Sequence, residues 1–314
     1  MNIIFMGTPE FAACSLRKLV VSQHNVLAVV TQPDRPKGRG MKVISSPVKE
    51  TALAHHIPCF QPERPKEKEF IDILRDLKPE TVVVSAYGHI IPRDILDIPP
   101  YGCVNIHSSL LPRYRGAAPM NWAIINGEAE TGITIMLMDE KMDTGDILLQ
   151  RAVSLAPTCT ARELYEVLAP IGAELLIEAL DGLEKDSITP VKQDDSKATY
   201  APKLKKEDGL INWEKSSKEI NNLIRGVNPW PGAFTYINNK LLKIWSAKIE
   251  DEKGLRGQPG EITLLSKDKM IVNTGDGSLS FLEVQMEGGK RMFIKDFLQG
   301  HPLKAGTVFK SRED

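Results

Sequence analysis

Residues 3–20 read Ile-Ile-Phe-Met-Gly-Thr-Pro-Glu-Phe-Ala-Ala-Cys-Ser-Leu-Arg-Lys-Leu-Val, and they decide the fold class. The opening apolar run predicts a buried strand that ends at Gly7, because a short continuous run is typical of a strand covered on both faces. Apolar side chains at positions 11, 16, 19 and 20 then share one face of a helix. A strand followed directly by a helix is the unit of a parallel α/β sheet.

The same alternation continues through the first half of the chain. Residues 26–30, 81–85 and 103–106 are further short apolar runs, each with a turn or helix pattern beside it. Right-handed crossovers between such strands predict a doubly wound, mostly parallel sheet with its ligand at the carboxyl ends of the strands. Residues 160–181 predict a long helix, with Thr160 and Glu163 at capping-box spacing and Gly182 as its end.

The sequence changes character after about residue 187. Residues 189–206 contain prolines and charges without periodicity, which indicates a linker. Short β-rich runs separated by Gly, Asn and Asp then predict a small antiparallel barrel or sandwich. We therefore expect a first, catalytic domain at residues 1–189, a linker at 190–206 and a second domain at 207–314.

Composition limits the classes of function. The chain has 314 residues with a net charge of −1, so it is no general polyanion binder and any nucleic-acid contact needs a local basic patch. Its four cysteines form no CxxC pair, which argues against a zinc ribbon or disulfide framework. We find no signal peptide and no stretch of roughly 18 apolar residues. These features predict a cytoplasmic protein without a membrane partner.

The stretch that carries chemistry is residues 105–119, Asn-Ile-His-Ser-Ser-Leu-Leu-Pro-Arg-Tyr-Arg-Gly-Ala-Ala-Pro. Asn105 and His107 stand two residues apart at a predicted strand end, so both side chains point to one face. Asp143 precedes Thr-Gly and is expected on a turn nearby. Acyl transfer to an amine needs an oxyanion donor, which an amide supplies, and a proton carrier, which an imidazole beside a carboxylate supplies.

Other interpretations of these residues stay open from the pattern alone. Asn, His and Asp in loops more often cap turns, so the residues by themselves indicate only a polar site. Asp139 and Asp146 compete with Asp143 for the carboxylate role. No G-x-G-x-x-G follows the first strand and no Walker A motif occurs, which weakens dehydrogenase and nucleotide-hydrolase interpretations.

The stretch 105–119, followed by Asp-Thr-Gly-Asp at 143–146, resembles the folate-dependent formyltransferases. Similar segments at 5–11, 32–40, 85–92 and 225–233 narrow the resemblance to members that act on methionyl-tRNA. The resemblance implies a Rossmann-like domain followed by an OB-like C-terminal β-barrel. It also implies 10-formyltetrahydrofolate as donor, initiator methionyl-tRNA as acceptor for translation initiation, and no metal.

The resemblance further assigns residues. It implies that Asn105, His107 and Asp143 are catalytic and that the amine attacks the formyl carbon without a covalent enzyme intermediate. The residues expected at the folate, the last five of them around its pterin ring, are Ser109, Leu110, Leu111, Pro112, Tyr87, Gly88, His89, Ile90 and Ile91.

Residues 33–49 form a basic connection that is long for a strand-to-helix loop. We expect Arg35, Lys37, Arg39 and Lys42 to contact RNA phosphates, with Arg39 as the main contact, because relatives use the matching loop on the acceptor stem. Lys203, Lys205 and Lys206 form a second, weaker phosphate track. The tryptophans at 213, 230 and 245 are expected in the core, and the chain is expected to be a monomer.

Three alternative functions remain from the sequence. They are formylation of a small amine (an amino-sugar nucleotide or a ribonucleotide amine), tRNA binding without catalysis, and hydrolysis of formyl-folate. The sequence does not determine affinities, the choice between initiator and elongator tRNA, or the protonation state of His107 during turnover.

Overall fold

The computed structural model describes residues 1–37, 42–251 and 257–311. The chain divides into two compact units. The first comprises Met1–Pro119, Thr131–Val153 and Tyr165–Ala201, and the second comprises Met120–Glu130, Ser154–Leu164 and Pro202–Asp314. The boundaries predicted at 189 and 207 stay a prediction, and the structure adds that two segments of the first half lie in the second unit.

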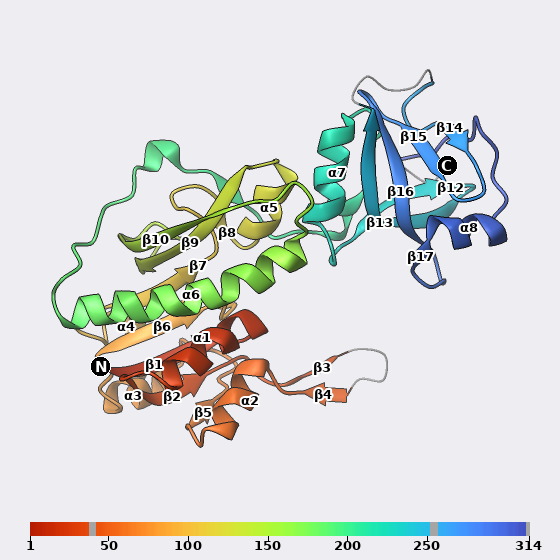
Figure 1. Cartoon of the computed structure of the whole chain (residues 1–314). Coiled ribbons are helices and arrows are strands. Elements are labelled where there is room, and N and C mark those ends of the chain that lie inside the picture. The colour runs from red at the N-terminus through yellow and green to blue at the C-terminus, as the bar shows by residue number, and fades with distance from the viewer. Residues whose placement is uncertain (38–41, 252–256, 312–314) are drawn as a thin grey trace. The chain divides into compact units, whose positions relative to one another are not determined.

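A seven-stranded sheet forms the first unit, in the order β10-β9-β7-β6-β1-β2-β5 (Figure 1). Within this sheet β1, β2, β5, β6 and β7 pair in parallel, and β9 joins β7 antiparallel. This confirms the predicted doubly wound, mostly parallel sheet. The strand bounds are β1 (Asn2–Gly7), β2 (Asn25–Val30), β5 (Cys59–Phe60), β6 (Thr81–Ser85), β7 (Cys103–His107), β9 (Glu130–Leu137) and β10 (Ile147–Ser154).

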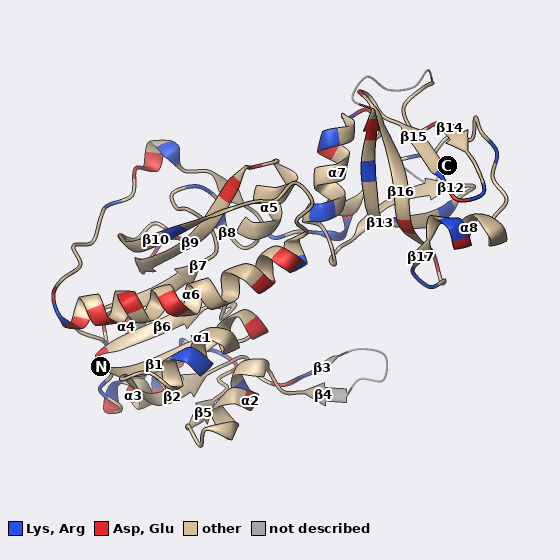
Figure 2. Ribbon diagram, in the orientation of Figure 1, with Lys and Arg blue, Asp and Glu red and all other residues tan. Residues whose placement is uncertain are grey.

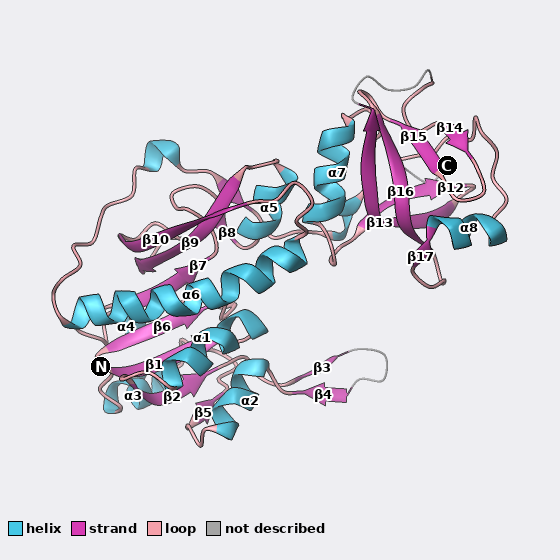
Figure 3. Ribbon diagram, in the orientation of Figure 1, coloured by secondary structure: helices cyan, strands magenta, loops and turns pink. Residues whose placement is uncertain are grey.

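Helices cover both faces of this sheet (Figure 3). Ile4 and Met6 of β1 pack into a core with α3 (Lys68–Asp76) and α4 (Arg93–Leu96). The opposite face is covered by α1 (Glu10–Val20) and α6 (Ala161–Glu184), whose Phe11 and Tyr165 rings lie 5.5 Å apart. Burial on both faces explains why the strands are continuous apolar runs. The short α2 (Pro47–Ala54) packs against α1.

The order of the strands reverses between β1 and β6, since β1 leads outward to β2 on one side and β6 leads to β7 on the other. A ligand crevice is expected at the carboxyl ends of strands at such a point. Gly7 ends β1 there, and a Cβ on it would lie 2.6 Å from Ala12 Cβ and 2.9 Å from the backbone oxygen of Ser85. Only glycine fits this turn.

Helix α6 begins as predicted and ends later than predicted. Glu163 Oε2 accepts from Thr160 N at 2.8 Å, and Thr160 Oγ1 accepts from Glu163 N at 3.3 Å, which confirms the capping box. The predicted end at Gly182 is wrong, because the helix continues to Glu184. Gly182 serves packing instead, since a Cβ there would lie 2.3 Å from Ile188 Cδ1.

The second unit contains an antiparallel sheet in the order β12-β13-β16-β15-β14, with β17 paired to β16. Isolated bridges from Tyr236 to Lys310 and from Glu261 to Val308 link its two edges through the C-terminal segment. The ladders leave the barrel open, yet these bridges are consistent with the predicted OB-like form. The element bounds are α5 (Pro119–Ile125), α7 (Ser217–Gly226), β12 (Ala233–Ile237), β13 (Lys240–Asp251), β14 (Ile262–Leu265), β15 (Met270–Asn273), β16 (Ser278–Met286), β17 (Met292–Phe293) and α8 (Ile294–Gly300).

The tryptophans of the second unit divide between core and surface. Trp213 is buried and stacks on Phe309 with ring centroids 5.7 Å apart, as predicted for a core residue. Trp230 is 56% exposed, so the core prediction is wrong for it. Trp245 is half-buried, with the cations of Lys243 and Arg291 near its ring.

Two structural observations concern the cysteines and the length of the helices. The four cysteines are all free thiols, as expected. Among the residues that the structure describes, no helix combines the length and the apolar character that crossing a membrane requires.

Candidate active site

Strand β7 becomes polar where its helical cover ends. Cys103 is buried, with Sγ 3.8 Å from the backbone oxygen of Ile95 in α4. Asn105 and His107 follow on the same face, because side chains alternate along a strand. Asn105 is half-buried, and within the described chain its amide makes no hydrogen bond. The amide is therefore available to a substrate, at the end of the sheet where the crevice is expected.

The His107 ring is almost fully buried and held in one orientation. Its Nε2 lies 2.9 Å from the backbone oxygen of Tyr114. A carbonyl oxygen only accepts hydrogen bonds, so Nε2 carries a proton and Nδ1 is the atom that can gain or lose one. Nδ1 lies 3.7 Å from Oδ2 of Asp143, which is longer than a direct hydrogen bond. The imidazole thus exchanges its proton on the side that faces a carboxylate.

Asp143 lies on the turn between β9 and β10, with a φ of 55°. Its Oδ2 accepts from the backbone N–H of Gly116 at 2.8 Å. Asp139 has a different role. Its carboxylate accepts from Thr144 Oγ1 at 2.7 Å and from Lys141 N at 3.0 Å, so it caps the turn. Asp146 is half-buried and makes no side-chain contact with His107 among the described residues. Asp143 is the carboxylate that the fold brings to His107.

The loop after His107 is fixed by two residues that the sequence did not indicate. Thr134 Oγ1 donates to the backbone oxygen of Ser109 at 2.6 Å and accepts from Leu111 N at 3.1 Å. Gln150 Nε2 donates to the oxygen of Leu111 at 2.9 Å. Ser109 Oγ itself donates to Arg113 O at 2.6 Å. The loop that contains Ser109, Leu110, Leu111 and Pro112 is therefore ordered, and its role at the folate stays a prediction.

The loop after β6 is tied to the neighbouring strand ends. The backbone oxygen of Tyr87 accepts from Thr8 Oγ1 at 3.2 Å and from Gln32 Nε2 at 3.1 Å. Burial raises the pKa of the Tyr87 hydroxyl to about 12, so it stays protonated at neutral pH. The Tyr87 and Ile91 side chains lie in the core beneath α3 and α4.

The other three residues predicted at the pterin line a cavity of about 520 Å³. Within the described chain, the Nε2 of His89 has no hydrogen-bond partner. Ile90 is 85% exposed, an unusual setting for a large apolar side chain. The cavity is lined by Glu63, Arg64, Pro65, Lys66, Gly88, His89, Ile90 and Pro92.

The basic connection forms an antiparallel ribbon of β3 (Arg35–Lys37) and β4 (Lys42–Ile44), in which Lys37 is paired with Lys42 (Figure 1). The Arg35 side chain is 68% exposed and lies 4.0 Å from a Glu63 oxygen. Figure 2 colours the positions of lysine and arginine along the chain blue. The predicted main contact, Arg39, lies outside the described residues.

Lys49, at the end of this basic segment, forms an ion pair inside the protein. Its ammonium is bound to Asp34, whose carboxylate also accepts from Gln61 Nε2 at 2.8 Å. These hydrogen bonds, first the one from Lys49, lower the pKa of Asp34. In the second unit, Lys203, Lys205 and Lys206 are all exposed.

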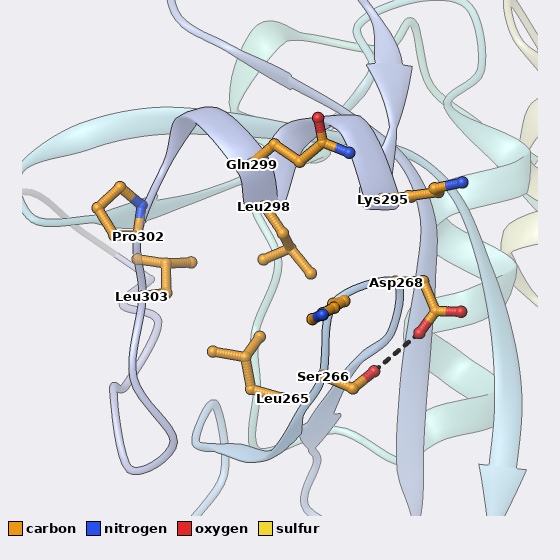
Figure 4. A pocket seen from close by; sticks show the side chains of 9 residues that line it. Leu265, Ser266, Asp268, Lys295, Leu298, Gln299, Pro302 and Leu303 are labelled. Carbon is orange, nitrogen blue, oxygen red and sulfur yellow. Dashed lines mark hydrogen bonds between the residues drawn. The ribbon is translucent and has the colours of Figure 1, made fainter.

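The second unit contains a hollow far from β7 in the sequence. In the second unit, a hollow of about 820 Å³ is lined by Leu265, Leu298 and Leu303 with Lys295 and Asp268 at its rim, and the Asp268 carboxylate is bound by Ser266 (Figure 4). It is larger than the cavity beside Ile90. Gln299 offers an amide there, but the described lining contains no histidine, so it lacks the imidazole that would carry a proton in acyl transfer.

Metal-ligating residue types gather at the start of β1. Ligand atoms of His24, Asp181 and Glu184 lie within 4.8 Å of one another. The amino group of Met1 lies 3.1 Å from Glu184 Oε1 and 3.2 Å from His24 Nδ1, so the cluster already holds one cation. Burial and this amino group lower the pKa of His24. The cluster lies at the amino end of β1, whereas His107 ends β7.

Comparison with known proteins identifies the family of the chain. The formyl transferase family model matches residues 1–180, and the model for the formyl transferase C-terminal domain matches residues 203–302. A methionyl-tRNA formyltransferase of Caldanaerobacter subterraneus subsp. tengcongensis is 51% identical over 311 residues, with 99% of this chain and 100% of the relative covered. The chain belongs to the methionyl-tRNA formyltransferase family.

Membership of the methionyl-tRNA formyltransferase family rests on more than one relative. The Pelotomaculum thermopropionicum member is 49% identical over 308 residues, which cover 98% of each chain. The solved structure of WlaRD, a sugar 3N-formyl transferase in the presence of dTDP and 5-N-formyl-THF, is 22% identical with a TM-score of 0.67, covering 91% of this chain and 97% of that one. That likeness shows a shared fold. The family predicted from the motif at 105–119 is confirmed.

Proposed function

We propose that this protein transfers the formyl group of 10-formyltetrahydrofolate to the α-amino group of initiator methionyl-tRNA in the cytoplasm, and that it acts as a monomer. The observation that carries the proposal is the His107–Asp143 pair at the end of β7, with Asn105 on the same face of the strand and its amide without a hydrogen bond among the described residues. This is the set of groups that acyl transfer to an amine requires. Its occurrence in a chain 51% identical to a methionyl-tRNA formyltransferase supports this choice of donor and acceptor.

The reaction begins with the acceptor amine, whose reference pKa is about 7.7–8.0, so a useful fraction is neutral near pH 7. The amine attacks the formyl carbon and the carbonyl electrons move to its oxygen. Asn105 donates a hydrogen bond to this oxyanion. Since Nε2 of His107 is engaged by Tyr114, Nδ1 takes the proton from the attacking nitrogen. The same proton is returned to the departing folate nitrogen as its bond to the formyl carbon breaks.

The cavity beside the loop 86–92 is the proposed site for the donor, and the charges of its lining support this. Arg64 and Lys66 line it together with Gly88 and His89, and Glu63 adds one acidic group to the lining. Two cations against one carboxylate, beside Pro65, Ile90 and Pro92, suit a ring system that carries carboxylates on its tail. The cavity belongs to the same α/β unit as His107.

The acceptor is proposed to meet the basic ribbon of β3 and β4, with Lys203, Lys205 and Lys206 as further phosphate contacts. A small amine is less well supported as the acceptor. The sugar formyltransferase is 22% identical to this chain, whereas the methionyl-tRNA formyltransferase is 51% identical. A transfer assay with labelled formyl-folate, offered methionyl-tRNA and small amines in parallel, tests the proposal.

A further inference from the structure

Gln193 is a buried amide whose hydrogen-bonding capacity is fully used beside Asp143. Its Nε2 donates to the backbone oxygen of Asp143 at 2.9 Å and to that of Gly145 at 2.7 Å. Its Oε1 accepts from Arg115 Nε at 3.1 Å and Nη2 at 2.8 Å. Carbonyl oxygens only accept and a guanidinium only donates, so the orientation of the amide is fixed.

Arg115 is itself held in place. Its side chain is almost fully buried, and Nη2 also donates to the exposed Asp195 at 2.7 Å. Its backbone N–H donates to Thr199 O at 2.8 Å, within the short pairing of β8 (Arg115–Gly116) with β11 (Tyr200–Ala201). A buried charge with this many partners forms a rigid support. Gln193 is therefore anchored to a segment that cannot easily move.

The segment Arg115–Gly116 restrains both the side chain and the main chain of Asp143. The N–H of Gly116 donates to the Asp143 carboxylate at 2.8 Å, while Gln193, anchored by the neighbouring Arg115, holds the Asp143 main chain. The φ of Asp143 is 55°, a region that residues other than glycine rarely adopt. Residues held there persist only when their surroundings impose the conformation. Gln193 supplies that restraint through two hydrogen bonds to the turn.

We propose that Gln193, supported by Arg115, is a positioning residue that holds the Asp143 carboxylate at His107 for formyl transfer. The proposal rests on the proposed function, because it assigns Gln193 an effect only through Asp143. The residue pattern around position 193 did not indicate Gln193, and the motif at 105–119 contains Arg115 without assigning it a role.

The sharpest variant is Gln193→Glu, which keeps the length of the side chain and an oxygen for Arg115 while it removes both donors to the turn. We expect kcat for formyl transfer to fall about tenfold or more, the effect typical of losing a group that orients a functional side chain. KM for donor and acceptor should stay near that of the wild type. Gln193→Met removes the same donors without a charge and serves if the first variant is unstable. Gln258→Glu, an exposed change in the second unit, is the matched control.

A double-mutant cycle with Asp143→Ala separates positioning from general destabilisation. If Gln193 acts through Asp143, the double variant is no slower than Asp143→Ala alone. If Gln193→Glu and Gln193→Met keep wild-type kcat while Asp143→Ala is slow, or if the two losses multiply, the positioning role is overturned and the proposed function stands. If Asp143→Ala itself turns over at the wild-type rate, the catalytic assignment of Asp143 fails and the positioning role fails with it.

Discussion

The Nε2 atom of His107 lies 2.9 Å from the backbone oxygen of Tyr114, so one nitrogen of the ring is committed to the fold and the other to chemistry. This division of roles makes a substitution experiment specific. A glutamine at this position can reproduce the hydrogen bond to Tyr114, because its amide nitrogen matches Nε2. It has no group that exchanges a proton near neutral pH.

We therefore expect His107→Gln to fold normally and to lose about 10²–10⁴-fold in kcat, the range for removal of a general acid–base group. KM for donor and acceptor should stay near that of the wild type, because the amide keeps the loop in place. Thermal denaturation provides the folding control. A variant with normal stability and wild-type kcat would show that His107 carries no proton in the reaction.

Asn105 offers a test that separates catalysis from stability. Its amide makes no hydrogen bond within the described chain, so Asn105→Ala should leave the free energy of unfolding nearly unchanged. Loss of an oxyanion donor should lower kcat about 10²–10³-fold, with little change in KM. Asn105→Asp keeps the shape and removes the N–H donors, and it should be at least as slow. A large loss of stability with unchanged kcat would instead make Asn105 a structural residue.

The basic ribbon predicts a particular dependence on salt. The exposed Arg35 should neutralise one phosphate, so Arg35→Ala should reduce the slope of log affinity for tRNA against log salt by about 0.7–0.9. Lys49 is already paired with Asp34, so Lys49→Met should leave that slope unchanged. Filter binding or anisotropy over a range of salt concentrations measures both. Equal slopes for the wild type and Arg35→Ala would exclude a phosphate contact by Arg35.

The capping box of α7 predicts a dependence of stability on pH. The hydrogen bond from Lys215, together with those from Ser216, lowers the pKa of Glu219 to about 2 from an ordinary value of 4.5. Because the folded-state pKa is the lower one, the stabilisation is complete above the ordinary value and is lost as the pH falls from about 4.5 toward 2. Glu219→Gln should be less stable than the wild type at pH 7, and urea denaturation should show this deficit shrinking at acid pH. A deficit independent of pH would contradict the assignment.

The sequence predicted those parts of the fold that local pattern controls. The parallel sheet followed from apolar runs such as residues 3–6, and the start of α6 followed from Thr160 and Glu163. The predicted end of α6 at Gly182 was wrong. A glycine stands there because Ile188 packs against it, and not because the helix ends. The prediction that Trp230 lies in the core was also wrong, because burial depends on neighbours in space that one sequence does not show.

The candidate site divides in the same way. The pattern predicted Asn105 and His107 at a strand end, and only the resemblance chose Asp143 over Asp139 and Asp146. In the structure, Asn105 and His107 share a face of β7, and Nδ1 of His107 lies 3.7 Å from Asp143 Oδ2. Thr134, Gln150 and Gln193 could not, because each acts through hydrogen bonds to backbone atoms of distant segments. Polar side chains used in this way leave no local pattern.

The most direct test of the account is a transfer assay with labelled 10-formyltetrahydrofolate and methionyl-tRNA, run with the wild type and with folding-competent Asn105→Ala and Asp143→Ala. We predict that the wild type places the label on the methionyl amino group and that both variants lose most of this turnover. Label released as formate, label transferred only to a small amine, or near-wild-type transfer by both variants would contradict the account.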